Sequence, residues 1–355
     1  MFVPPPPTVT PVSTKKAPKE VVAKPIEVRK PFMPLREAKC HPLEEQIEWV
    51  NIRNLCCSEN PTAGVFFVET QKEGQVVVVK ATSTLAQEIF GGMIASFLGL
   101  VTPQIRLMEY RADFKNPIKN YWVDCKKNLK DFATRNQMYS EERKIAKELY
   151  RAFFLLIELV EGAVSLEDLM NDEQLANEIL KNPKVLHDIG KMIVMDIVLN
   201  NCDRFPLGLI WDHEGNPSNI LFSIRKNRLA CIDQPFMAIF DSKQRSQYLQ
   251  KVQAFSNVCV KENRLDNNPY IEQISTYIHN VTGVVLDTES KAIVLGGIVE
   301  GSNQLKDLSK EKLEVLKTSI EKMKTGSDYE GTYFTSLVTI DIDFIHDAIQ
   351  HMTVN

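Results

Sequence analysis

The pattern of hydrophobic and polar residues predicts strands in the first part of the chain. Between residues 47 and 80, three short apolar runs are separated by turn-forming segments, which is typical of successive antiparallel strands. Residues 84–100 then carry apolar side chains at helical spacing, and the hydroxyl residues at 82–84 are available to cap this helix. Residues 102–110 and 151–162 predict two further strands. The first part is therefore a sheet with one main helix.

The second part of the chain has the periodicity of helices. Residues 185–201 predict a long helix, and most of the chain beyond Phe240 alternates helical patterns with polar loops. One hairpin interrupts this region, with strands at 219–223 and 228–233 around the turn at 224–227. An antiparallel sheet followed by helices predicts the α+β class.

The N-terminal residues differ from both parts in composition. Residues 1–36 contain nine of the 18 prolines and seven Lys or Arg against two Glu, which is too polar and too proline-rich to bury a core. We therefore predict three regions: a proline-rich basic arm at 1–40, an N-lobe with the sheet and its main helix at 41–160, and a mostly helical C-lobe at 161–355.

Composition and charge argue against several classes of function. The formal net charge of −4 argues against general nucleic-acid binding. No apolar run has the length that a bilayer requires, and the N-terminus lacks the apolar core of a secretory signal. The seven cysteines are scattered and never spaced C-x-x-C, which favours reduced thiols in the cytoplasm over a disulfide framework or a zinc site.

Polar side chains converge at the open end of the predicted hairpin. Asn219 and Asp233 are symmetric about Lys226, so both lie at the end away from the turn. The loop that carries Asp203 and Arg204 must arrive at the same end. Taken alone, an Asp–Arg pair after a helix is more often a surface ion pair of little energetic value. Together, however, these carboxylate and carboxamide oxygens make a site suited to Mg²⁺.

The strand-rich half supplies a second charged pair. Lys80 ends the most apolar strand, and Glu88 lies in the first turns of the helix that follows. A lysine at the rim of a buried strand needs a partner for its charge, and Glu88 can provide one and direct the ammonium towards a phosphate. The order Lys, Glu, Asp, Asn, Asp matches the groups that phosphoryl transfer requires.

Two segments show a resemblance to a known family. Residues 76–92 (VVVVKATSTLAQEIFGG) and the segments NNCDRFPLGLIWDHEGNPSNILF and CIDQPF, within residues 200–236, resemble the catalytic domain of the actin-fragmin kinases, an atypical, phosphoinositide-3-kinase-like form of the protein-kinase fold. The resemblance implies a two-lobed protein-kinase-like fold that uses ATP and Mg²⁺ to phosphorylate Ser or Thr of a protein substrate, actin in complex with fragmin. Mn²⁺ accepts the same oxygen ligands. We expect a cytoplasmic, cytoskeleton-associated monomer with neither nucleic acid nor membrane as partner.

The resemblance also implies a role for each matching residue. Lys80 would hold the α- and β-phosphates and Glu88 would orient it. Asp203 would be the catalytic base, while Asn219 and Asp233 would ligate the metal. The backbone at Leu159, Val160 and Glu161 would bind the edge of the adenine.

The chain departs from ordinary kinases around the phosphates. It has no G-x-G-x-x-G, so the segment 58–64 (SENPTAG) must cover the phosphates with backbone and hydroxyl donors, for which Ser58 and Thr62 are candidates. A longer insert after Asp203 makes Asn216 a rival to Asn219, although the strand that follows favours Asn219.

Two other functions share these residues. A small-molecule or lipid phosphotransferase of the same fold has the same Asp–Arg loop, but the chain has no basic cluster around that loop to attract an anionic headgroup. A catalytically inactive binding module would have lost one of the catalytic groups, and all are present here. A third reading makes Cys202 a thiol nucleophile, but no histidine lies near it in the sequence to act as its base.

Overall fold

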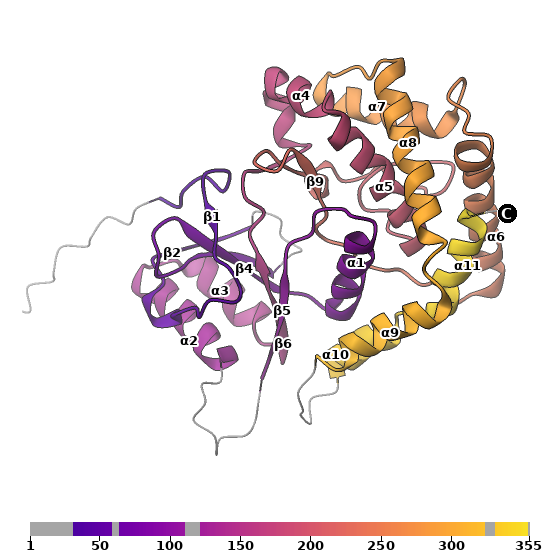
Figure 1. The fold of residues 1–355 in the computed structure, drawn as a ribbon. Coiled ribbons are helices and arrows are strands. Elements are labelled where there is room, and N and C mark those ends of the chain that lie inside the picture. Colours follow the sequence, from indigo (N-terminus) through magenta and orange to yellow (C-terminus); the bar gives the residue numbers. More distant parts are fainter. Residues whose placement is uncertain (1–30, 59–63, 111–120, 324–330, 354–355) are drawn as a thin grey trace, which may run out of the picture. The chain divides into compact units, whose positions relative to one another are not determined.

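The strands predicted between residues 47 and 80 form an antiparallel meander in the computed structural model, which describes residues 31–58, 64–110, 121–323 and 331–353. The six strands of this sheet are β1 (Lys39–Cys40), β2 (Asn54–Cys57), β3 (Gly64–Glu69), β4 (Gln75–Ala81), β5 (Ile105–Glu109) and β6 (Phe153–Glu158). A 3₁₀ turn, η1 (Trp49–Asn51), replaces the start of the first predicted strand. The order is β2-β3-β4-β6-β5, and β1 pairs parallel with β4 (Figure 1).

The alternation of side chains along β4 gives the sheet two different faces. Val77 and Val79 point to one face, where they form a hydrophobic cluster with α2 (Tyr121–Arg135) and α3 (Tyr139–Glu148). Lys80 points to the other face, towards α1 (Leu85–Phe97), which is the main helix predicted from the sequence. The prediction of one main helix missed α2 and α3, although the buried side chains of α2 follow helical spacing.

The predicted arm ends earlier than expected. Lys39 and Cys40 form β1, and Phe32, Met33 and Leu35 pack against a small buried cluster of Ala38, Val76 and Leu159. Residues 32–40, which the prediction placed in the arm, therefore pack on the sheet. Residues 1–30 lie outside the described residues, and so does Thr62.

This packing predicts different effects for two truncations. Removal of residues 1–30 should leave the melting temperature nearly unchanged, whereas removal of residues 1–40 should lower it by roughly 5–10 °C, because three half-buried apolar side chains and a strand pairing are lost. Thermal unfolding of both variants tests this. Equal melting temperatures would show that the segment 32–40 contributes nothing to the fold.

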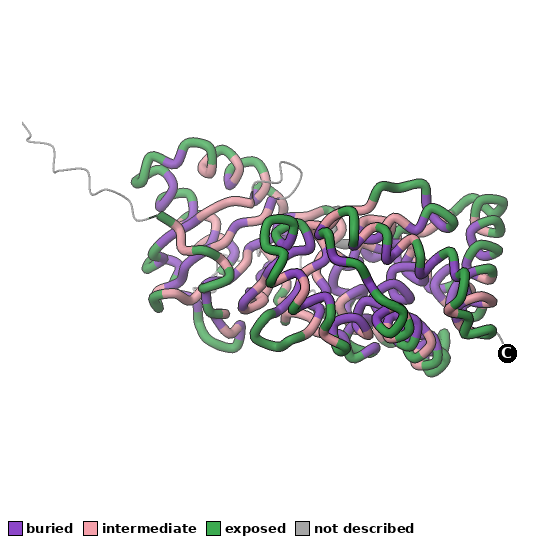
Figure 2. The backbone as a smooth tube through the Cα atoms, turned by 90° about the horizontal axis from the view of Figure 1, so that it is seen from above, coloured by how far each residue is buried: buried purple, intermediate pink, exposed green. Residues whose placement is uncertain are grey.

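The C-lobe is built around one buried helix. Its elements are β7 (Ala163–Ser165), η2 (Asp168–Asn171), α4 (Glu173–Leu180), α5 (Pro183–Leu199), η3 (Pro217–Asn219), β8 (Leu221–Ser223), β9 (Arg228–Ala230), α6 (Ser242–Ser256), η4 (Asn257–Lys261), α7 (Pro269–Thr282), α8 (Thr288–Leu305), α9 (Lys310–Glu321), α10 (Gly331–Val338) and α11 (Ile342–Met352). Most residues of α5 are buried, and Figure 2 shows such buried segments inside the helical part. α5 crosses α8 closely, since a Cβ on Gly190 would lie 2.2 Å from the carbonyl oxygen of Val294.

The predicted hairpin is present and shorter than expected. β8 and β9 pair antiparallel, with Leu221 opposite Ala230, and β7 pairs antiparallel with β8. Residues 231–233, which the prediction placed in the second strand, follow β9 and are not part of it.

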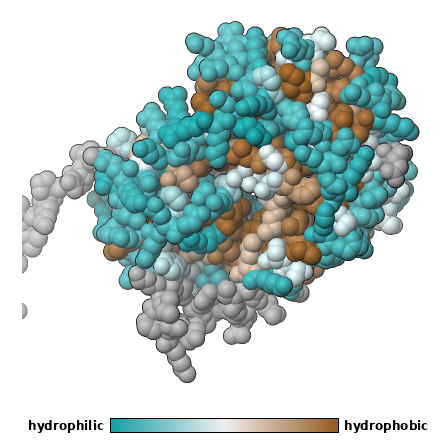
Figure 3. All heavy atoms as spheres, viewed as in Figure 1, coloured by the Kyte–Doolittle hydropathy of each residue, from teal (hydrophilic) through white to brown (hydrophobic). Residues whose placement is uncertain are grey.

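Among the described residues, no helix is both long and apolar enough to cross a bilayer. On the face drawn in Figure 3, hydrophilic residues cover most of the surface and hydrophobic residues gather in its middle.

Candidate active site

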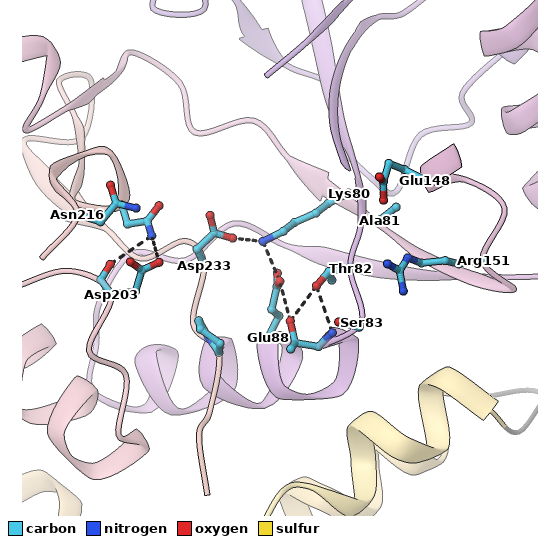
Figure 4. Close-up of a pocket in the computed structure, with 13 residues that line it drawn as sticks. Lys80, Ala81, Thr82, Ser83, Glu88, Glu148, Arg151, Asp203, Asn216 and Asp233 are labelled. Carbon is cyan, nitrogen blue, oxygen red and sulfur yellow. Dashed lines mark hydrogen bonds and ion pairs between the residues drawn. The ribbon is translucent and has the colours of Figure 1, made fainter. Parts of the chain in front are cut away.

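A pocket of about 460 Å³ lies where the end of β4 and the start of α1 face the loop after α5 and the segment after β9 (Figure 4). Its lining residues are Lys80, Ala81, Thr82, Ser83, Thr84, Glu88, Glu148, Arg151, Asp203, Asn216, Asn219, Asp233 and Pro235. Every residue that the sequence predicted as catalytic or metal-binding is among them. Lys80 and Asp233, which are 153 positions apart in the chain, therefore share one cavity.

Lys80 and Glu88 form the predicted ion pair at the back of the pocket. Their nitrogen and oxygen atoms, Nζ and Oε1, are 2.7 Å apart, and the two side chains are only 10% and 7% exposed. The hydroxyl of Thr84 lies 3.5 Å from the same carboxylate oxygen. Because water screens this pair little, its attraction is stronger than that of a surface pair. The Lys80 ammonium on β4 is therefore held in place by Glu88 of the next element, α1.

Asp233 is the second carboxylate in contact with the Lys80 ammonium. Its backbone φ is +51°, a left-handed conformation that few residues other than glycine adopt and that aspartate tolerates better than most. Asp233 is about one-third exposed, in contrast to Glu88. The carboxylate therefore lies at the open side of the pocket, where a ligand can reach it.

Asp203 lies across the pocket from Lys80 (Figure 4). Asn219 holds it there through hydrogen bonds. The Asn219 side-chain amide donates to Oδ2 of Asp203 at 2.7 Å and to its carbonyl oxygen at 3.2 Å. Among the described residues the amide oxygen of Asn219 has no hydrogen-bond partner, whereas the amide oxygen of Asn216 accepts from the backbone N–H of Ser218. Asn219 lies in the turn η3 and not in the predicted strand.

Arg204 connects the loop after α5 with the backbone on either side of the β8–β9 hairpin. It is fully buried, and its guanidinium contacts the carboxylate of Asp196 in α5. The same guanidinium donates to the carbonyl oxygens of Asn219 at 3.3 Å, Asp233 at 3.0 Å and Ile232. The Asp–Arg pair after α5 is therefore no surface ion pair. Arg204 fixes the backbone on which Asp203, Asn219 and Asp233 are placed.

Burial perturbs two ionisable groups beside Arg204. It raises the pKa of Asp196 to about 7, although the Arg204 charge and a hydrogen bond from Asn201 act in the opposite direction. Asn201 in turn accepts from the backbone N–H of Asp203 at 3.2 Å. Burial also raises the pKa of the Cys202 thiol. A thiol held in its protonated form is a poor nucleophile, which speaks against covalent catalysis at this position.

The residues predicted for the adenine edge lie at the end of β6. Leu159 is buried against Val76 and Ala38, on the face of the sheet that also carries Lys80. The carboxylate of Glu161 accepts from the backbone N–H of Cys40 and pairs with Arg225, both at 2.8 Å. Its carbonyl oxygen accepts from the hydroxyl of Ser223 at 2.9 Å. Glu161 is therefore occupied by contacts within the chain.

The candidate phosphate donor Ser58 directly follows β2. Its backbone N–H donates to the carbonyl oxygen of Val65 at 3.0 Å, and its carbonyl oxygen accepts from the ammonium of Lys144 in α3 at 3.2 Å. The helix that the sequence analysis missed thus contacts the start of the segment expected to cover the phosphates. Thr62, the other candidate, lies outside the described residues.

Three residues near the site escaped the sequence analysis. Glu148 and Arg151 line the pocket at the end of α3, and Figure 4 shows Arg151 on the side of Lys80 away from Asp203. Tyr277 of α7 faces the loop that carries Asp203, and its burial together with the charge of Asp203 raises its pKa to about 12. Nothing in the sequence near these residues marks them, because only the packing of α3 and α7 brings them here.

The oxygen atoms of the pocket fit a magnesium ion held together with phosphates. Among the described residues, no three His, Cys, Asp or Glu side chains converge as a complete metal site. Asp233 and the free amide oxygen of Asn219 would supply two hard oxygen ligands, and Mg²⁺ in nucleotide sites takes its other ligands from phosphate and water. The donor set therefore suits Mg²⁺ bound with a nucleotide, and Mn²⁺ equally.

Comparisons with known proteins show a common family. The model of the family described as "Actin-fragmin kinase, catalytic" matches residues 38–302. A Dictyostelium discoideum protein provisionally named an actin-fragmin kinase is 24% identical over 329 residues, which are 87% of this chain and 74% of the relative. A second protein of that organism, with the same provisional name, is 26% identical over 159 residues, 45% of this chain and 34% of the relative.

Among solved structures, the chain is similar to the Helicobacter pylori proinflammatory kinase CtkA. The matched region covers 75% of this chain and 97% of the CtkA chain, with 12% sequence identity. The TM-score is 0.26, which is too low to support an argument about the fold. The family match alone covers about three quarters of the chain. With the sheet, the helical lobe and the Lys80–Glu88 pair, it confirms the predicted two-lobed, protein-kinase-like α+β fold. The chain belongs to the actin-fragmin kinase catalytic family of protein kinases.

Proposed function

We propose that the chain is an ATP-dependent protein serine/threonine kinase whose substrate is actin in complex with fragmin. The observation that supports this most is that Lys80 with Glu88, Asp203 with Asn219, and Asp233 all line one pocket. These are the phosphate-holding, hydroxyl-activating and metal-holding groups of phosphoryl transfer. The family's name supplies the identity of the protein substrate.

Each group has a separate task in this proposal. When bound, Mg-ATP supplies the γ-phosphoryl group and the cation that neutralises its charge, with Asn219 and Asp233 as the protein ligands. Lys80 stabilises negative charge on the phosphates, and Glu88 keeps its ammonium in place. Asp203 accepts the proton of the substrate hydroxyl, and the Asn219 amide fixes the orientation of that carboxylate. Nucleotide binding must compete with the Lys80–Asp233 ion pair.

The base of the nucleotide would lie on the apolar part of the same sheet face. Val76 and Val78 share the Lys80 face of β4 because side chains two residues apart point the same way. Leu159 packs beside Val76. The backbone of Leu159, Val160 and Glu161 remains our candidate for the adenine edge. The Glu161 carbonyl oxygen already accepts from Ser223, and the Leu159 backbone hydrogen-bonds the Cys40 thiol. Ser58 and Thr62 remain our candidates for the phosphate cover.

The pocket argues against the alternative of a lipid or small anionic phosphate acceptor. Arg204, the cation of the Asp–Arg loop, is fully buried and turned away from any substrate. The charged lining comprises four carboxylates against Lys80 and Arg151. An inositol phosphate would therefore meet net negative charge around Asp203, whereas a neutral serine or threonine hydroxyl would not.

The test is transfer of labelled γ-phosphate from ATP with Mg²⁺ to three acceptors: actin–fragmin complex, actin alone and phosphoinositide vesicles. We expect label on serine or threonine of actin in the complex, and none when Lys80 is replaced by Met. Transfer to the lipid but not to protein would establish the alternative. If no acceptor is labelled by the intact chain under conditions where it binds Mg-ATP, the proposed function is wrong.

A further inference from the structure

The helix that carries Glu88 is capped by a residue from the C-terminal end of the chain. The first N–H groups of a helix have no partner within it and are usually satisfied by the side chain just before the helix. Thr84 occupies that position in α1 but makes no such hydrogen bond. Instead the backbone N–H of Ala86 donates to the hydroxyl oxygen of Ser336 in α10, at 2.8 Å.

Ser336 belongs to a buried set of hydrogen bonds that joins α1 to α10. Its hydroxyl donates to the side-chain oxygen of Gln87 at 3.1 Å, and the amide nitrogen of Gln87 donates to the hydroxyl of Thr339 at 2.6 Å. The Thr339 hydroxyl donates back to the carbonyl oxygen of Ser336 at 2.7 Å. Ser336 is 2% and Gln87 is 7% exposed, so water does not compete well for these groups.

This connection lies directly beside the ion pair of the site. Ala86 and Gln87 immediately precede Glu88, whose carboxylate holds Lys80 at 2.7 Å. One turn further along, α1 packs against Gln234, since a Cβ on Gly91 would lie 2.6 Å from the Gln234 Cβ. Figure 1 shows α9 and α10 running beside α1, and Leu337 belongs to the same hydrophobic cluster as Leu85.

We propose that Ser336 is a positioning residue for phosphoryl transfer: it caps α1 from the C-terminal end of the chain and so keeps Glu88 in contact with Lys80. The assignment of the reaction rests on the proposed function. Ser336 and Thr339 lie beyond residues 38–302, which the family model matches. The helices near the C-terminus therefore cap α1 in the N-lobe and also form part of the core of the C-lobe.

The test compares Ser336→Ala with Ser319→Ala. Ser319 of α9 contacts the same helix through the sulfur of Met93, 3.8 Å away, but it caps nothing. For Ser336→Ala we expect about a tenfold lower kcat with less than a twofold change in the KM for ATP, and faster hydrogen exchange of the Ala86–Glu88 amides. Ser319→Ala should match the unsubstituted chain in both respects, and Ser336→Thr, which keeps the hydroxyl, should restore both.

Hydrogen exchange separates this proposal from the proposed function. If the intact chain transfers no phosphate to any acceptor, the exchange of the α1 amides still decides whether Ser336 caps the helix. Unchanged exchange at Ala86–Glu88 in Ser336→Ala would overturn the proposal whatever the activity. So would faster exchange with an unaltered kcat, because Glu88 would then not depend on the cap.

Discussion

Asp203→Asn is expected to lower turnover by about 10²–10⁴-fold, the range typical for loss of a general base. The carboxamide has nearly the shape of the carboxylate but cannot accept a proton from the substrate hydroxyl. The Asn219 amide, which donates to Oδ2 of Asp203 at 2.7 Å, can still donate to a carbonyl oxygen there. Folding should therefore be preserved, and the loss should appear in kcat.

The matched control for this substitution is Asp212→Asn. Asp212 is exposed in the insert that follows Asp203 and does not line the pocket. Its replacement removes the same charge a few residues away and should leave turnover within about twofold, since distant exposed charges are screened. Steady-state rates with the protein substrate compare the two. Equal losses would show that the net charge of the insert matters more than a base at position 203.

Arg204→Met should lower the free energy of unfolding by about 3–5 kcal/mol, because it leaves the buried carboxylate of Asp196 without its partner. Urea unfolding measures this loss. The control is Arg264→Met: Arg264 pairs with Glu262 where the two side chains are 45% and 51% exposed, so its loss should cost less than about 1 kcal/mol. A similar small cost for Arg204→Met would mean that the buried pair contributes little.

A double variant separates the contribution of the Asp196–Arg204 pair to stability from the role of Arg204 in positioning the site. Replacing both partners, as Asp196→Leu with Arg204→Met, removes the buried charges together and should restore much of the stability. Activity should stay low, because the carbonyl oxygens of Asn219 and Asp233 have still lost their donor. Full recovery of activity in the double variant would show that Arg204 does not position the site.

The convergence of the site could be predicted from the sequence because it depends on local rules. The prediction that Asn219 and Asp233 lie at the open end of the hairpin follows from antiparallel pairing, and the hairpin is present. Its centre lies between Arg225 and Lys226 and not at Lys226, because Leu221 is opposite Ala230. Lys80 and Glu88 lie on consecutive elements, so their ion pair is also a local outcome. Neither conclusion required knowledge of how the lobes pack.

Contacts between distant segments could not be predicted in the same way. The sequence shows Arg204 beside Asp203 but gives no sign that Arg204 is buried under the hairpin, where it binds three backbone carbonyls. Ser336 caps α1 across 250 positions of the chain. The residues at 32–40 follow the proline-rich arm directly, and the sequence does not show that their apolar side chains pack in a cluster on the sheet. Such contacts depend on tertiary packing, which composition does not reveal.

The assignment of separate tasks to the two aspartates is tested most directly by calorimetric titration of Mg-ATP into Asp203→Asn and Asp233→Asn. Asp203 faces the substrate hydroxyl in our account, so its variant should bind Mg-ATP with nearly unchanged affinity. Asp233 is the proposed metal ligand, so its variant should bind Mg-ATP at least about tenfold more weakly, because a carboxylate ligand of the cation is lost. Weak binding by Asp203→Asn together with unchanged binding by Asp233→Asn would contradict the account.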